Sequence, residues 1–173
     1  MEILISQIVG SLAIITITAS VHFKKKNHMM MVQSLAHFLY AIQYIILNAY
    51  SAAYMDAVAI IRNLIYYKYD STKSKIPIIL PIIICSIIIV IGYLNYSGII
   101  SLIPIVIALS YTIAATFKNP KVYKYVFGIC ALGWLYYNFK CGAYVCLFGN
   151  LFEFFSTLIA LINEKRKRKK YLF

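Results

Sequence analysis

Apolar residues fill most of the chain in long runs, and short polar segments separate one run from the next. A helix that crosses a bilayer needs about 20 mostly apolar residues, which matches the length of these runs. The runs lack the alternation of apolar and polar residues that a membrane-spanning strand requires. The predicted spans are residues 3–23, 30–48, 51–68, 76–94, 99–117, 122–139 and 143–163.

The loops between these seven spans are only a few residues long, so we expect no soluble domain. Positive residues concentrate in the first, third and fifth loops and in the C-terminal tail. They are Lys24, Lys25, Lys26, Lys68, Lys73, Lys75, Lys118, Lys121, Lys124, Lys165, Arg166, Lys167, Arg168, Lys169 and Lys170. Cytoplasmic loops of membrane proteins carry the excess of Lys and Arg. The pattern therefore predicts an outside N-terminus and a cytoplasmic C-terminus, which requires an odd number of spans.

The composition excludes the soluble nucleic-acid-binding proteins that a basic chain would otherwise suggest. The 173 residues include 17 Lys and Arg against 5 Asp and Glu, a net charge of +12, but 62% are hydrophobic and only 13% are charged. Soluble domains carry about 25% charged residues. We interpret the basic tail as a solvated cytoplasmic end that also attracts anionic lipid headgroups, and we expect no nucleic-acid partner.

Motifs of enzymes and metal sites are absent from the sequence. There is no phosphate-binding loop, nucleophile elbow, HExxH motif or Rossmann fingerprint, so we expect no enzymatic activity, cofactor or metal. The four cysteines, Cys85, Cys130, Cys141 and Cys146, form no CxxC pair and are interpreted as small buried side chains. Whether Cys141 and Cys146 are oxidised stays open.

The first three spans align with the last three, without gaps, at an offset of 94 residues. The matched pairs are Gly10 with Pro104, Thr16 with Ser110, Thr18 with Thr112, Phe23 with Phe117, Lys24 with Lys118, Tyr40 with Trp134, Ala49 with Ala143, Tyr50 with Tyr144, and Asp56 with Asn150. A three-helix unit ends on the opposite side of the membrane from its start, so an extra span must precede a parallel copy. We therefore predict a first three-helix bundle (residues 1–70), a linker helix (71–97) and a second bundle with a basic tail (98–173). Parallel repeats of this kind occur in transporters, with the substrate site near the midplane.

This arrangement resembles that of the SWEET-type proteins, a superfamily with sugar facilitators, PQ-loop transporters and nicotinamide riboside carriers. SWEET-type sites use a Trp on the second helix of a unit and an Asn on the third. Trp134 and Asn150, 16 residues apart, fit this pattern in the second unit, and Tyr40 and Asp56 have the same spacing in the first. The resemblance implies that these four residues bind the substrate, with the aromatic rings as walls.

The stretch Leu39–Tyr67 also resembles a bacterial inner-membrane family, the YgjV type, and this likeness extends over nearly the whole chain. It implies a multi-pass protein of the bacterial inner membrane. SWEET-type bundles flex at a Pro in the first helix of each unit, which implies hinges at Pro104 and at its counterpart Gly10. Asp56 departs from the SWEET pattern, because it introduces a charge where the pattern has Asn.

Three ionisable residues, Asp56, Arg62 and Glu153, lie inside predicted spans. Each costs about 2.5–3.5 kcal/mol there and is a candidate functional residue. Asp56 would bind a polar or cationic solute or a proton, or it would be a structural carboxyl held by Tyr hydroxyls. Arg62 and Glu153 would form a buried ion pair or a gate that breaks on switching, and Arg62 could instead extend toward the cytoplasmic face.

His37, Tyr40 and Tyr44 share one face of the second span, because they are spaced at i, i+3 and i+7. We predict that His37 and Tyr44 add polar groups to the pocket. A hydrogen-bonded core histidine is the alternative interpretation of His37.

The sequence thus predicts an all-α membrane protein with seven transmembrane helices, arranged as two parallel three-helix bundles joined by a linker helix. Its predicted function is the transport of a small polar solute, sugar-like or vitamin- and nucleoside-like, by alternating access. A non-transporting inner-membrane protein, either lipid-binding or a subunit of a complex, is the alternative. An oligomer is compatible with this fold but is not required, and the solute and any ion coupling stay open.

Overall fold

The computed structural model describes residues 2–72, 74–117, 119–141 and 143–170, without the side chains of Glu2, Pro120 and residues 164–170. Its described residues are all-helical. The elements are α1 (Glu2–Ser20), α2 (Lys26–Ile46), α3 (Tyr50–Ser71), α4 (Ile79–Leu94), the 3₁₀ turn η1 (Ile99–Ser101), α5 (Leu102–Thr116), α6 (Pro120–Lys140) and α7 (Tyr144–Lys170). Each of the seven α-helices coincides with one predicted span, which confirms the expected number of helices.

Among the described residues, four segments are long and apolar enough to cross a membrane, namely Ile3–Ser20, Lys26–Ile46, Ile99–Thr116 and Tyr144–Asn163. Helix α4 is as apolar but shorter. Helices α3 and α6 are more polar, and in α3 the polar residues Asp56, Arg62 and Asn63 are all buried. The outward side of α3 instead carries apolar side chains such as Ile61 and Leu64. A polar interior within an apolar exterior is the distribution that a lipid environment favours.

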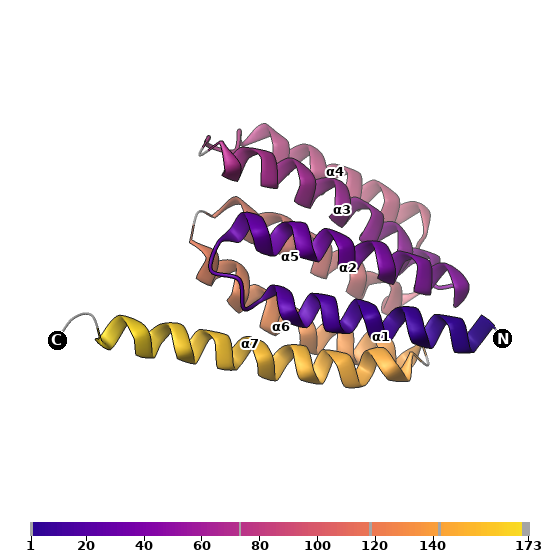
Figure 1. The fold of residues 1–173 in the computed structure, drawn as a ribbon. Coiled ribbons are helices and arrows are strands. Elements are labelled where there is room, and N and C mark those ends of the chain that lie inside the picture. Colours follow the sequence, from indigo (N-terminus) through magenta and orange to yellow (C-terminus); the bar gives the residue numbers. More distant parts are fainter. Residues whose placement is uncertain (1, 73, 118, 142, 171–173) are drawn as a thin grey trace.

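Six of the helices form a closed ring. In order around the ring, α1 packs against α2, α2 against α3, α3 against α5, α5 against α6, α6 against α7, and α7 against α1. Helix α4 lies outside the ring, where it contacts α3 and α5. Successive helices run in opposite directions, so the N-terminus and the C-terminal end of α7 lie at opposite ends of the bundle (Figure 1).

The positions that are buried in α1–α3 tend to be buried again 94 residues later. Helices α2 and α6 begin and end 94 residues apart, and α3 and α7 also begin 94 residues apart. Buried pairs at this spacing include Ile17 with Tyr111, Gln43 with Tyr137, Ala52 with Cys146, Asp56 with Asn150, and Asn63 with Thr157. The contact of α1 with α7 corresponds in the same way to that of α5 with α3.

Two positions predicted as hinges have packing roles in the structure. Gly10 lies inside the continuous helix α1, and a Cβ atom there would collide with the side chain of Gln43 on α2. Pro104 lies in the first turn of α5, directly after η1, where a proline removes no helical hydrogen bond. Neither residue produces a kink within its α-helix.

The segments between α1 and α2, α3 and α4, and α5 and α6 meet at one end of the bundle, the end toward which α7 also runs (Figure 1). We call it the basic end because most of the Lys and Arg residues occur there. Of the basic residues named above, Lys73, Lys118 and the side chains of Lys165–Lys170 lie outside the described residues. Lys26 is buried and donates hydrogen bonds to the carbonyl oxygens of Ala115 and, at 3.0 Å, Phe117. It therefore caps the C-terminus of α5, a role that favours a cation.

Candidate functional site

A cavity lies in the interior of the ring. All six ring helices contribute to its lining, and α4 does not. The lining residues are Ile17, His37, Tyr40, Tyr44, Asp56, Tyr111, Phe127, Trp134, Asn138, Asn150 and Glu153. The centre of a water-sized sphere can reach about 30 Å³ of this space, which is room for about two water molecules. The cavity is therefore small in this conformation.

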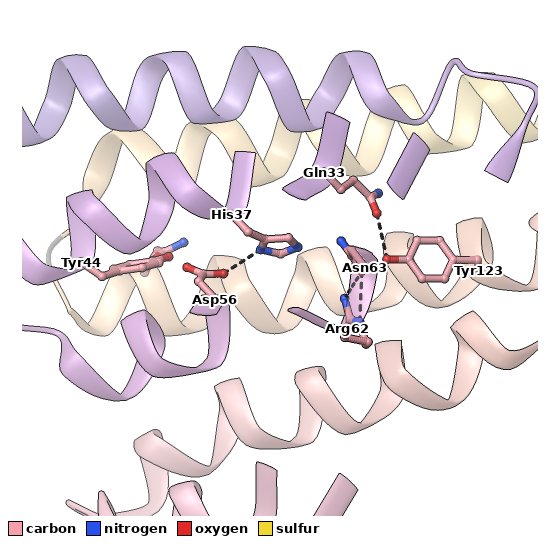
Figure 2. A network of polar contacts seen from close by, with 8 residues as sticks. Gln33, His37, Tyr44, Asp56, Arg62, Asn63 and Tyr123 are labelled. Atoms are coloured by element: carbon pink, nitrogen blue, oxygen red, sulfur yellow. Dashed lines mark hydrogen bonds and ion pairs between the residues drawn. The ribbon is translucent and has the colours of Figure 1, made fainter. Parts of the chain in front are cut away.

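His37 and Asp56 form a buried pair at one side of the cavity. His37 Nδ1 lies 2.7 Å from Asp56 Oδ1, and both residues are buried. The pair joins α2 to α3 across the interior (Figure 2). The second carboxylate oxygen, Asp56 Oδ2, is buried and has no hydrogen-bond partner among the described residues. Native proteins rarely leave such an atom unpaired, because desolvation without a partner costs about 1–3 kcal/mol.

A chain of side-chain hydrogen bonds links α2, α6 and α7 at the cavity. The Tyr44 hydroxyl donates to Asn138 Oδ1 at 3.1 Å, and Asn138 Nδ2 donates to Asn150 Oδ1 at 2.8 Å. Asn150 Nδ2 in turn donates to Glu153 Oε2 at 3.2 Å. The chain fixes the orientation of both amides, so that Glu153 is held by a partner on its own helix.

Aromatic rings form the walls of the cavity. Tyr40 stacks on Tyr44 and Tyr44 on Trp134, with ring centroids 6.1 Å apart in both pairs and interplanar angles of 23° and 17°. Tyr111 and Phe127, 5.7 Å apart, contribute two further rings. Stacked rings of this kind present flat π-faces, which bind planar groups and attract cations.

A second group of polar side chains lies between the cavity and the basic end, and we call it the inner layer. Arg62 donates to Asn63 Oδ1 from Nε at 3.1 Å and from Nη2 at 2.9 Å, and to Thr112 Oγ1 at 3.5 Å. The Tyr123 hydroxyl donates to Gln33 Oε1 at 2.9 Å (Figure 2). Because Arg62–Thr112 joins α3 to α5 and Gln33–Tyr123 joins α2 to α6, the inner layer ties α2 and α3 to α5 and α6.

Contacts between the same two sets of helices also close the cavity at its other end. Ser51 Oγ lies 3.2 Å from the Tyr137 hydroxyl, which joins α3 to α6. The Cys146 thiol lies 3.1 Å from Gln43 Oε1, which joins α7 to α2. The cavity therefore has polar contacts between α2–α3 and α5–α7 on both sides.

The structure brings most of the predicted site residues together. All four proposed substrate ligands line the one cavity, as do His37, Tyr44 and Glu153. Arg62 does not line it, and among the described residues it forms no ion pair with Glu153. In this conformation neutral hydrogen-bonding groups, Asn63 and Asn150, hold the two side chains separately. The gate that Arg62 and Glu153 were expected to form stays a prediction. The thiols of Cys141 and Cys146 are free.

Sequence reasoning missed several lining residues, above all Asn138, Tyr111 and Phe127. The repeat contained a signal for Asn138, because it lies 94 residues after the predicted pocket residue Tyr44. It contained a weaker one for Tyr111, whose counterpart Ile17 also lines the cavity. Phe127 was not distinguishable from the aromatic residues expected near span ends.

Comparison with known proteins gave a match to one family. The family model for bacterial inner membrane proteins of the Imp-YgjV type matches residues 4–169. No curated protein and no solved structure matches the chain.

Proposed function

The chain belongs to the Imp-YgjV family of bacterial inner membrane proteins, and from this premise we propose that it transports a small polar solute across that membrane by alternating access. One observation carries the proposal. All six ring helices contribute to the lining of the cavity. The lining contains the buried His37–Asp56 pair, two hydrogen-bonded amides and stacked aromatic rings. Substrate sites of transporters built from parallel repeats have this central position between the units.

The proposed architecture is two parallel three-helix units, α1–α3 and α5–α7, with α4 as the linker, in the SWEET-like arrangement. Three observations support this architecture. The starts of the helices, the buried positions and the contacts between the units all repeat at a spacing of 94 residues. A two-fold axis along the membrane normal would relate the units. Sequence identity between the two units is low, so the shared burial pattern carries more weight than matched residues.

The same architecture suggests how access could alternate. The inner layer would close the cavity toward the basic end, and the Ser51–Tyr137 and Gln43–Cys146 contacts would close the other end. Each of these contacts joins the first unit to the second, so a rocking motion of the units would break one set while keeping the other. The present conformation corresponds to an occluded state with both sets formed.

We further propose that the basic end faces the cytoplasm, where Lys and Arg residues favour the anionic lipid surface. The N-terminus would then lie outside. A monomer would be sufficient for transport, because the six ring helices enclose the cavity within one chain.

The test is uptake into proteoliposomes that contain the purified protein. Sugars, nucleosides, amines and organic acids are supplied separately, and uptake is compared with that of protein-free vesicles. Asp56→Asn should reduce the uptake of the transported solute, whereas Asp70→Asn should not, because Asp70 lies at the far end of the same helix, outside the cavity lining. If no solute of any class enters, or if both variants act alike, the transport proposal fails and a non-transporting role is favoured.

A further inference from the structure

We propose that the cavity binds the ammonium group of a small organic amine, and this inference rests on the proposed function of the cavity as a substrate site. The charges around the cavity give the first argument. The chain contains 17 Lys and Arg and only 5 Asp and Glu. The cavity lining nevertheless contains two carboxylates, Asp56 and Glu153, and no Lys or Arg. An anionic solute would therefore meet two acidic groups, and the base in the lining, His37, is already paired with Asp56.

The free oxygen of Asp56 gives the second argument. Asp56 Oδ1 is occupied by His37, whereas Oδ2 is buried without a partner among the described residues. A carboxylate oxygen only accepts hydrogen bonds, so the group that completes it must be a donor. An ammonium N–H supplies both the donor and the opposite charge, and such charge-assisted bonds are about twice as strong as neutral ones.

The aromatic walls favour the same class of ligand. Tyr40, Tyr44 and Trp134 line the cavity together with Asp56, and their stacked faces attract cations. Glu153 is the second acid of the lining, and Asn150 Nδ2 occupies its Oε2 atom. The cavity therefore combines the two kinds of group that proteins use for organic cations.

The size of the cavity restricts what part of the ligand it holds in this conformation. The accessible space of about 30 Å³ admits a group of the size of one or two water molecules. An ammonium head group has this size, whereas a sugar ring does not. The remainder of the amine would occupy space that opens when the two units separate.

Trp134 makes the proposal testable without a transport assay, because it is the single tryptophan of the chain and lines the cavity. The purified protein in lipid nanodiscs is titrated with ethylammonium, isobutylammonium and benzylammonium, and Trp134 fluorescence is recorded. The neutral alcohols of the same carbon skeleton and the matching carboxylates serve as controls. We expect a saturable change in Trp134 fluorescence with at least one ammonium ion. The alcohol of the same skeleton should bind at least about tenfold more weakly, because it cannot form the charged hydrogen bond.

Two isosteric variants extend the test to the residues. Asp56→Asn and Glu153→Gln should each weaken amine binding, Asp56→Asn by about tenfold or more, while Asp70→Asn should bind as the unaltered protein does. Equal binding of amine and alcohol by the unaltered protein overturns the proposal even if neither variant folds. So does the absence of a response to every ammonium ion.

The flux measurements separate this inference from the proposed function. If an amine binds but no solute crosses the proteoliposome membrane, the transport proposal fails and the ammonium site stands. If a sugar or an acid is transported while no ammonium ion binds, transport stands and the ammonium site is wrong.

Discussion

Tyr44 and Asn138 are hydrogen-bonded to each other in the interior of the bundle, close to the C-terminal ends of α2 and α6, and they are 94 residues apart in the chain. The same offset relates α2 to α6. In the proposed arrangement of two parallel units, contact between two equivalent positions is expected only close to the axis that relates the units. The bond therefore joins the two halves of the chain at the point where the cavity lies between them.

This relationship leads to a first prediction. Asn138→Leu should lower the free energy of unfolding by about 1–3 kcal/mol, because the Tyr44 hydroxyl and the Asn150 amide lose their buried partner. Tyr44→Phe removes only one side of one bond and should cost less, about 0.5–1.5 kcal/mol. Thermal or denaturant unfolding in a mild detergent measures both values. Tyr54→Phe, on the exposed side of α3, is the matched control and should have no measurable effect.

The second prediction concerns Arg62 and Glu153. Because different neutral groups hold the two charges, a double-mutant cycle with Arg62→Met and Glu153→Gln should give additive changes, within about 0.5 kcal/mol. The same cycle with Arg62→Met and Asn63→Ala should show coupling, because the guanidinium donates twice to Asn63 Oδ1. Both cycles use unfolding in detergent. Coupling between positions 62 and 153 would mean that the two residues do pair in a populated conformation.

Much of the architecture was accessible from the sequence because the bilayer imposes a simple length rule on apolar runs. The seven helices, their alternation and the basic end follow from that rule. Lys26 was not predictable in this way, since the pattern marks it as a loop residue and tertiary packing makes it the cap of α5. The apolar run predicted a start at residue 30, whereas α2 starts at Lys26.

The candidate site, like the fold, was predictable from the sequence only in part. The resemblance to the SWEET-type pattern, together with the spacing of 94 residues, implied Tyr40, Asp56, Trp134 and Asn150, and all four line the cavity. The side-chain pairing within the site depends on rotation and depth of each helix, which spacing does not define. The His37–Asp56 contact therefore became visible only in the structure.

The third prediction tests the close contact of α1 with α2. Gly10→Ala should destabilise the protein by about 1–3 kcal/mol, because the new methyl group would occupy the space of the Gln43 side-chain amide, which is fully buried and bonded to Cys146 and therefore has little room to move aside. Gly128→Ala is the control, since the atom nearest to its Cβ would be Thr157 Cγ2 at 3.3 Å and the neighbour needs to yield only slightly. Equal losses of stability in the two variants would show that packing at Gly10 is not specifically tight. A loss of uptake by Gly10→Ala without a loss of stability would support the hinge role instead.

The fourth prediction concerns orientation in the membrane and uses a natural cysteine. Cys141 follows α6 at the end of the bundle opposite to the basic end, and it is an exposed residue whose thiol is partly buried, whereas Cys130 and Cys146 are buried. A membrane-impermeant maleimide should therefore label Cys141 from outside in intact spheroplasts, and Cys141→Ser should abolish the labelling. Burial raises the pKa of the Cys141 thiol, and the thiolate is the form that reacts, so mildly alkaline buffer is required.

The control for this labelling lies at the other end of the bundle. In a Cys141→Ser background, Thr72→Cys introduces a thiol at an exposed position after α3, at the basic end. It should be labelled only after the membrane is permeabilised, because the proposed orientation places that end in the cytoplasm. The reverse pattern, with position 72 labelled in intact spheroplasts and Cys141 only after permeabilisation, would invert the proposed orientation. The inner layer around Arg62 would then close the cavity toward the outside.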